Sequence, residues 1–125
     1  MLNHQSNTET KEAGCLLEQS YTLQGMAIPQ QRLDVIRQYR DNHLNDQAAG
    51  SELINFYYEV SKQFADNQDL SESEHKKIAY FFTAEFTPKI LKMIESANPN
   101  KEAIITETRQ ALDWALENTK QQIAH

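Results

Sequence analysis

Apolar side chains recur every three or four positions along much of the chain, the spacing that gathers them on one face of an α-helix. The most regular stripe predicts a helix that follows a break at Gly50 and has Ser51 as its N-terminal cap. This stripe consists of Leu53, Phe56, Tyr57, Val60 and Phe64. A second helix is predicted from Pro29, whose missing amide costs nothing in a first turn, to about Asn45.

A third helix is predicted to open with a capping box, in which Ser71 and Glu74 satisfy each other's free amides. Its inward face is expected to hold Ile78, Ala79, Phe82 and Phe86, widened by Tyr80 and Phe81. Pro88 cannot sit deep inside a helix without distorting it, so we expect a break or sharp bend there, with Thr87 as a cap. A short helix with Ile90, Leu91 and Ile94 then follows.

The turn signal at residues 98–100 precedes a helix that is predicted from about Lys101 to Ile123. Its inward residues are expected to be Ile105, Leu112, Leu116 and Ile123, flanked by Ile104, Ala111 and Ala115. Near the N-terminus, the segment from Cys15 to Leu23 fits either a short helix or an extended arm, which Gly25 ends. No run alternates apolar and polar residues for long enough to predict a strand.

These patterns predict an all-α fold, a single-domain bundle of four to five helices over residues 13–125. A flexible N-terminal tail is predicted over residues 1–12, which lack apolar periodicity. The total of 125 residues suits one domain, and a domain of this length buries roughly two-thirds of its unfolded surface.

Charge and cysteine content narrow the classes of partner. The net charge of −6 argues against nucleic acid and anionic membrane surfaces, because binding to phosphate groups depends on clustered Lys and Arg. No stretch approaches the roughly 20 apolar residues that span a bilayer.

The single cysteine, Cys15, excludes an internal disulfide and an all-cysteine metal site. The polar segment before it does not fit a secretion or lipid-attachment signal, so we expect a cytoplasmic protein.

The sequence contains no pattern that is typical of catalysis or metal binding. Cys15 could form a thiolate–imidazole pair with His43 or His75, but a small buried thiol beside solvent-facing histidines is the simpler interpretation. Glu72 and His75 have the Glu-x-x-His spacing of di-iron bundles, but no second pair occurs. We therefore expect no enzyme activity, no cofactor and no metal.

Candidate binding residues lie in two places. Arg40 falls on an apolar stripe and must find an acceptor for its planar guanidinium group; Arg37 and Asp41 lie beside it. That acceptor is either internal, such as Asp41, Glu59 or a helix C-terminal carbonyl, or it is an anionic ligand or a partner's carboxylate. With an anionic ligand, Arg37, Arg40 and Asp41 form a ligand site. Tyr58 and Trp114 lie off the main stripes, at the rim of the core or in an interface with a protein partner.

The segment from residue 36 to residue 65 resembles the CFI-box family of bacterial proteins. The family's Leu-Arg-x-Phe-Arg-Asp helix is matched by Ile36-Arg37-Gln38-Tyr39-Arg40-Asp41, and its leucine and glycine by Leu44 and Gly50. The Tyr-Tyr-x-x-Ser element and the later alanine are matched by Tyr57-Tyr58-x-x-Ser61 and Ala65. The resemblance implies a helical module in which these elements form one structural unit, and it implies no known biochemical activity.

The box that gives the family its name is degenerate in this chain. Cys15 is followed by Leu16-Leu17 where the family has Phe-Ile, and Tyr21 lacks an adjacent glycine. Lys62-Gln63 replace the prolines of the pattern.

Two functions are consistent with all of these features. The first is a non-enzymatic interaction module or adaptor with a protein partner or a second copy, and the alternative is a small anionic-ligand binding protein using Arg37 and Arg40.

Overall fold

The computed structural model describes residues 15–45, 47–67 and 70–124, with side chains as far as Thr119. Within these residues the fold is all-α and contains no strand, which confirms the predicted fold class. The tail predicted over residues 1–12 lies outside the described residues, as does the predicted inward side chain of Ile123.

The described residues form five helical rods. Two of the rods contain π-helical turns, in which each hydrogen-bonded ring holds one residue more than in an α-helix. The elements are α2 (Leu16–Leu23); α3 (Gln30–Tyr39) with the π-helical turn η1 (Arg40–Leu44); α4 (Ala48–Asp66); α5 (Glu72–Tyr80), continued by the π-helical turn η2 (Phe81–Phe86) and α6 (Thr87–Ile94); and α7 (Lys101–Ala124).

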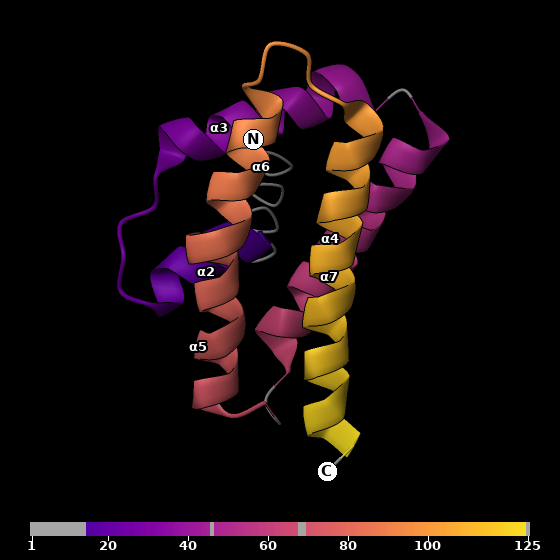
Figure 1. The fold of residues 1–125 in the computed structure, drawn as a ribbon. Helices are drawn as coiled ribbons and strands as arrows, with labels where there is room; N and C mark the ends of the chain where they lie inside the picture. Colours follow the sequence, from indigo (N-terminus) through magenta and orange to yellow (C-terminus); the bar gives the residue numbers. More distant parts are fainter. Residues whose placement is uncertain (1–14, 46, 68–69, 125) are drawn as a thin grey trace, which may run out of the picture.

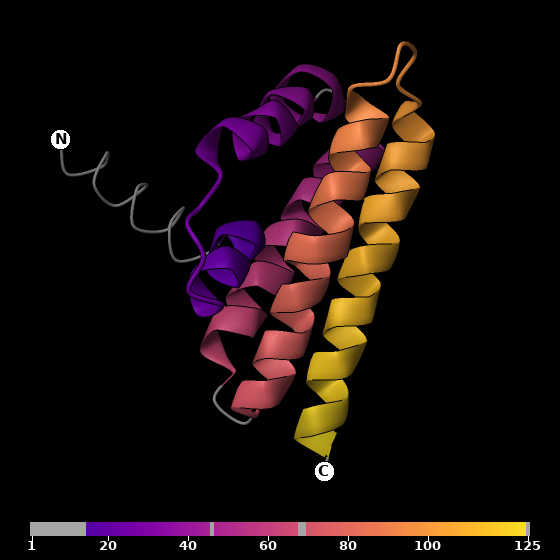
Figure 2. The same cartoon turned by 60° about the vertical axis from the view of Figure 1, so that its left-hand side comes forward.

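Three long rods run side by side, and two shorter ones cover one side of them (Figure 1). The continuous α5–η2–α6 rod and α7 lie next to each other and are joined at the upper end (Figure 2). α4 packs against α7 and α2, whereas α2 also packs against α5. α3 crosses the upper end of the bundle and contacts α6, and the core contains side chains from all five rods.

The core is made of the stripes that the sequence spacing indicates. Its largest fully buried apolar side chains are Phe82, Leu16, Leu33, Ile78, Ile90 and Leu112. The stripe of α4 is confirmed, with Leu53, Val60 and Phe64 buried and the two aromatic residues between them half-buried. Because burial of one such side chain stabilises a protein by about 1.5–3 kcal/mol, these contacts hold the rods together.

Two predicted helix ends are confirmed. α2 ends at Leu23, just before Gly25, whose positive φ of 72° is the left-handed conformation that glycine adopts without strain. The amides of Gly25 and Met26 donate to the carbonyls of Thr22 and Tyr21, the pattern of a Schellman motif. At the start of α5, the Ser71 hydroxyl accepts the backbone amide of Glu74 at 3.1 Å.

The predicted break at Gly50 is wrong, and so is the predicted cap at Ser51. α4 begins at Ala48, so Gly50 lies inside its first turn. A Cβ atom at Gly50 would lie 2.9 Å from the Cα of Leu44 and closer still to the Leu44 carbonyl oxygen. Glycine is therefore required because η1 and the first turn of α4 approach each other closely, whereas Ser51 donates its hydroxyl to Asn45.

The predicted break at Pro88 is also wrong. Pro88 lies in the first turn of α6, which follows η2 without interruption, and the rod continues through it (Figure 2). In a π-helical turn each carbonyl pairs with the amide five positions later and not four. This altered pairing before Pro88 lets the rod continue although proline has no amide hydrogen to donate. Thr87 does not cap a new helix; it is fully buried and donates its hydroxyl to the Phe82 carbonyl at 2.7 Å.

Two inward faces differ in detail from the prediction. Tyr80 is 59% exposed and does not widen the core face of its rod, although its neighbour Phe81 is half-buried. On α7 the most buried residues are Ile104, Ala111, Leu112, Ala115 and Thr119. The predicted Ile105 and Leu116 lie at the edge of that face, so the helix is rotated by about one position from its expected orientation.

Candidate ligand-binding cavity

A cavity of about 110 Å³ lies inside the upper half of the bundle, and we call it the central cavity. All five rods contribute to its wall, which is mainly aliphatic and aromatic. The apolar wall is formed by Leu17, Leu33, Ile36, Leu44, Leu53, Ile54, Phe82, Phe86, Ile90, Ile94, Ile104 and Leu112. The remaining lining residues are Cys15, Arg37, Tyr39, Arg40, Tyr57, Tyr58 and Thr108.

Both π-helical turns contribute to this wall. In η1 and the residue before it, Tyr39 and Leu44 are both buried although they are five positions apart. In a regular α-helix such a pair would point about 140° apart, so the wider turn is what brings both side chains inward. In η2, Phe82 and Phe86 also line the cavity, with ring centroids 5.5 Å apart.

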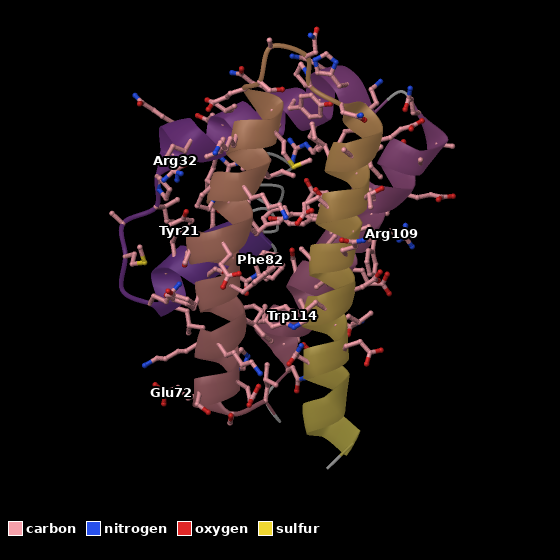
Figure 3. The ribbon with its side chains drawn as sticks, viewed as in Figure 1. Tyr21, Arg32, Glu72, Phe82, Arg109 and Trp114 are labelled. Atoms are coloured by element: carbon pink, nitrogen blue, oxygen red, sulfur yellow. The ribbon has the colours of Figure 1, made fainter. Side chains whose placement is uncertain are left out.

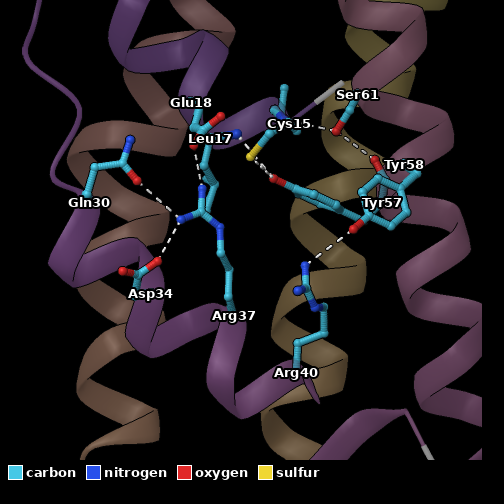
Figure 4. A network of polar contacts seen from close by, with 11 residues as sticks. Cys15, Leu17, Glu18, Gln30, Asp34, Arg37, Arg40, Tyr57, Tyr58 and Ser61 are labelled. Carbon is cyan, nitrogen blue, oxygen red and sulfur yellow. Dashed lines mark hydrogen bonds and ion pairs between the residues drawn. The ribbon is translucent and has the colours of Figure 1, made fainter. Parts of the chain in front are cut away.

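A polar cluster lies where α4 meets the start of α2 (Figure 4). The Ser61 hydroxyl accepts the backbone amide of Leu16 at 3.0 Å, and the Tyr57 hydroxyl accepts that of Leu17 at 3.2 Å. The first amides of a helix have no partner within it, so α4 supplies the cap that α2 lacks in its own sequence. The Cys15 thiol lies 3.2 Å from the same Tyr57 hydroxyl.

Burial raises the pKa of Tyr57 well above its ordinary value of 10.0. The neighbouring Cys15 raises this pKa further, through its electrostatic interaction and its hydrogen bond with Tyr57, whereas the backbone hydrogen bond from Leu17 lowers it. Tyr57 therefore stays a neutral hydroxyl at physiological pH, and it acts as a structural donor and acceptor inside the wall of the cavity.

Arg37 is held by acidic partners from two helices. Its Nη2 atom lies 2.5 Å from the Glu18 carboxylate on α2, and its Nη1 atom lies 2.9 Å from Asp34. Nη1 also approaches the amide oxygen of Gln30 at 3.4 Å (Figure 4). Burial alone would lower the pKa of Arg37, but the hydrogen bond with Asp34 and the charge of Glu18 outweigh it, so the pKa is raised.

Arg40 has weaker partners. Its Nε atom bonds the carboxylate of the adjacent Asp41 at 2.9 Å, and its Nη1 atom donates to the Tyr58 hydroxyl at 3.3 Å. Burial would lower the pKa of Arg40, but Asp41 and Tyr58 outweigh it and the pKa is raised. Of the internal acceptors expected for Arg40, the structure shows Asp41, which pairs with Arg40 and not with Arg37.

The two predicted interface residues lie far apart in the fold. Tyr58 is 42% exposed and stands beside Arg40 at the rim of the central cavity. Trp114 lies between α7 and the α5–η2–α6 rod (Figure 3), with its ring centroid 4.6 Å from that of Phe81. The structure thus brings Arg37, Arg40, Asp41 and Tyr58 into one region and leaves Trp114 outside it.

The spacing of Arg40 and its apolar neighbours indicated an arginine on the inner face of its helix. Sequence reasoning missed Glu18 and the contact between Cys15 and Tyr57, because these partners are 19 and 42 positions away along the chain. The five-residue spacing of Tyr39 and Leu44 is the one signal that would have indicated the widened turn.

Among the described residues, no group of three His, Cys, Asp or Glu side chains is placed to hold a metal ion. Glu72 pairs with Lys76 at 3.3 Å, and both ring nitrogens of His75 lie 3.2 Å from carbonyl oxygens, those of Ser71 and Phe64. The Glu-x-x-His spacing therefore belongs to helix-end contacts. None of the helices in the described part of the chain is both long and apolar enough to cross a membrane.

Comparison of the chain with models of protein families, with curated proteins and with solved structures gives no match. The resemblance to the CFI-box family is therefore neither supported nor contradicted and stays a prediction. The elements that carry it do lie together, because Cys15 and Tyr57 are in contact and Arg40 bonds Tyr58. The class defined by the fold is an all-α helical bundle with an internal apolar cavity.

Proposed function

We propose that this chain is a non-enzymatic binding protein for a small molecule that has an apolar body and an anionic group. The apolar body occupies the central cavity, and the anionic group lies at its rim, where Arg37 and Arg40 are found. The observation that carries this proposal is the cavity itself, an apolar space among helices that are otherwise packed against one another. Ligand sites are commonly apolar hollows of this kind, with a few polar groups at one end.

The size and the wall of the central cavity favour a compact ligand. A volume of about 110 Å³ is of the same order as an engineered apolar cavity of about 150 Å³ that binds benzene. Phe82, Phe86 and Leu112 offer only carbon atoms to an occupant. An apolar ring or a short branched chain therefore fits, and a long acyl chain does not.

The charge of the lining favours an anion. Among the described residues, Arg37 and Arg40 are the only charged side chains that line the central cavity, and no carboxylate does so. This is notable in a chain with a net charge of −6. An arginine presents a planar set of donors that suits carboxylate and phosphate groups.

Toluene, a neutral apolar probe, tests whether the central cavity takes up a small molecule. We expect NMR shift changes on titration to concentrate at lining residues, and we expect Ile94→Phe, which fills the cavity, to abolish them. Leu116→Phe is the matched control, because Leu116 is also half-buried but lies outside the lining. Identical binding by Ile94→Phe and the unmodified protein would rule out the cavity as the site.

A second proposal, an interaction module or adaptor that binds a protein partner or a second copy, is supported by one observation. Tyr58 exposes 42% of its surface, and tyrosines are enriched at interface hot spots. Light scattering after size-exclusion chromatography tests self-association, with Tyr58→Ala expected to shift a dimer to monomer. A monomer at all concentrations would remove the second-copy form of the proposal. For both functions we propose a cytoplasmic setting, as the sequence predicts.

A further inference from the structure

The two arginines at the central cavity differ in how fully their guanidinium groups are already bonded. Arg37 uses both of its terminal nitrogens, on Glu18 and Asp34. Glu18 is only 13% exposed in its side chain, so a ligand that took Arg37 from it would leave a nearly buried carboxylate without a partner. Such a loss is costly, because a buried charge is stable only when it is paired. Arg37 is therefore part of the wall, not a ligand group.

Arg40 is placed differently. Its carboxylate partner, Asp41, is 54% exposed and would return to water at little cost. Its bond to the Tyr58 hydroxyl is long, at 3.3 Å, and within the described residues the Nη2 atom of Arg40 has no hydrogen-bond partner. The Arg40 side chain is 29% exposed and also lines the cavity, so it can reach both solvent and an occupant.

Building on the proposed function, we propose that the ligand is a small monocarboxylate that replaces Asp41 on Arg40. One carboxylate oxygen accepts from the Arg40 guanidinium, and the Tyr58 hydroxyl donates to the other. The apolar body extends into the central cavity, and Asp41 turns to solvent. Tyr58 can serve this role because its hydroxyl already lies beside Arg40 and its side chain is exposed enough to move.

The surrounding charges favour a single negative charge on the ligand. Glu18, Asp34 and Asp41 all lie within ion-pair distance of the two arginines. Three carboxylates beside two guanidinium groups would repel a dianion such as phosphate more strongly than a monocarboxylate, which adds only one negative charge and takes over the position of Asp41 on Arg40. The volume of the cavity limits the apolar body to about the size of a benzene ring.

The test uses isothermal titration calorimetry with benzoate, with its neutral counterpart benzamide, and with inorganic phosphate. We expect Arg40→Gln to weaken benzoate binding by about tenfold or more, the loss of one charge-assisted interaction, and to weaken benzamide binding by much less, since its neutral amide oxygen is a poorer acceptor. We expect Asp41→Asn to tighten benzoate binding, because the internal competitor is gone. Arg32→Gln is the control, since Arg32 is an exposed arginine of α3 that does not line the cavity.

The outcomes separate this inference from the proposed function on which it rests. Equal affinity for benzoate and benzamide, both abolished by Ile94→Phe, would overturn the carboxylate role of Arg40 and leave the cavity as a binding site. Phosphate binding that is tighter than benzoate binding and depends on Arg40 would also overturn it. If toluene, benzoate and benzamide all fail to bind, the proposed function and this inference are both wrong.

Discussion

The hydroxyl of Ser61 on α4 accepts the backbone amide of Leu16 on α2 at 3.0 Å, across 45 positions of sequence. The same hydroxyl donates to the Tyr57 carbonyl, one turn earlier on α4, at 2.8 Å. Both Ser61 and Leu16 are completely buried, so no water replaces this bond. The short helix α2 is therefore fixed to the bundle at its N-terminal end, where its amides would otherwise have no partner.

This relationship predicts that Ser61→Ala destabilises the protein by about 1–3 kcal/mol, because the Leu16 amide is left buried without an acceptor. The measurement is urea-induced unfolding followed by circular dichroism. Ser96→Ala is the control, since its hydroxyl bonds the Met93 carbonyl at an exposed position and we expect a loss below about 0.5 kcal/mol. Equal stability of the two variants would contradict the role of Ser61 as a cap.

The raised pKa of Tyr57 leads to a prediction of how the stability of the protein changes at alkaline pH. Its pKa is raised in the folded state, so the folded protein retains the hydroxyl proton where the unfolded chain releases it. The resulting stabilisation is complete below about pH 10, the ordinary tyrosine value, and is lost as the pH rises above it. Burial also raises the pKa of Tyr39, which acts in the same direction.

We expect Tyr57→Phe to lower stability at neutral pH, since the Leu17 amide loses its acceptor, and to flatten the fall in stability above pH 10. Chemical unfolding measured between pH 8 and about pH 11 tests both effects. Tyr80→Phe, at an exposed position, controls for the loss of one tyrosine. An unchanged slope in Tyr57→Phe would show that Tyr57 is not the group responsible.

The close packing of Gly50 against Leu44 leads us to expect a large loss of stability when a single methyl group is added there. In Gly50→Ala the new Cβ would overlap the backbone of Leu44, which cannot turn aside as a flexible side chain can. We expect a loss of about 2 kcal/mol or more, together with a displacement of η1 from α4. Gly25→Ala is the comparison, because its positive φ costs about 1 kcal/mol while space around it is open. Thermal unfolding of the two variants should therefore rank Gly50→Ala as the less stable.

Much of this fold follows from local sequence, for reasons that particular residues illustrate. The apolar stripe of α4 is regular over three turns, so Leu53, Val60 and Phe64 are buried as predicted. Ser71 and Gly25 mark helix ends because their chemistry acts within a few residues of the chain. Whether a segment forms a helix depends mainly on residues close to one another along the chain, so the sequence predicts it well.

The predictions that failed depend on contacts between distant segments or on the shape of the backbone. The sequence predicts a helix break at Gly50, because only the packing of Leu44 against it explains a glycine inside a first turn. It predicts a break at Pro88 because the π-helical turn before the proline has no simple sequence signal. Arg37 and Arg40 were found together on one helix, but only the tertiary contact with Glu18 separates their roles.

The difference between Arg37 and Arg40 leads to a last prediction, which concerns stability alone. Arg37→Gln leaves the Glu18 carboxylate, 13% exposed, without its cationic partner, so we expect a loss of about 2 kcal/mol, and we expect Glu18→Gln in the same chain to recover part of it. Arg40→Gln removes a pair whose carboxylate is 54% exposed, and we expect a loss below about 1 kcal/mol. Urea unfolding of the three variants tests this order. If Arg40→Gln were the more damaging single change, Arg40 would be the structural arginine, and it would not be available to a ligand.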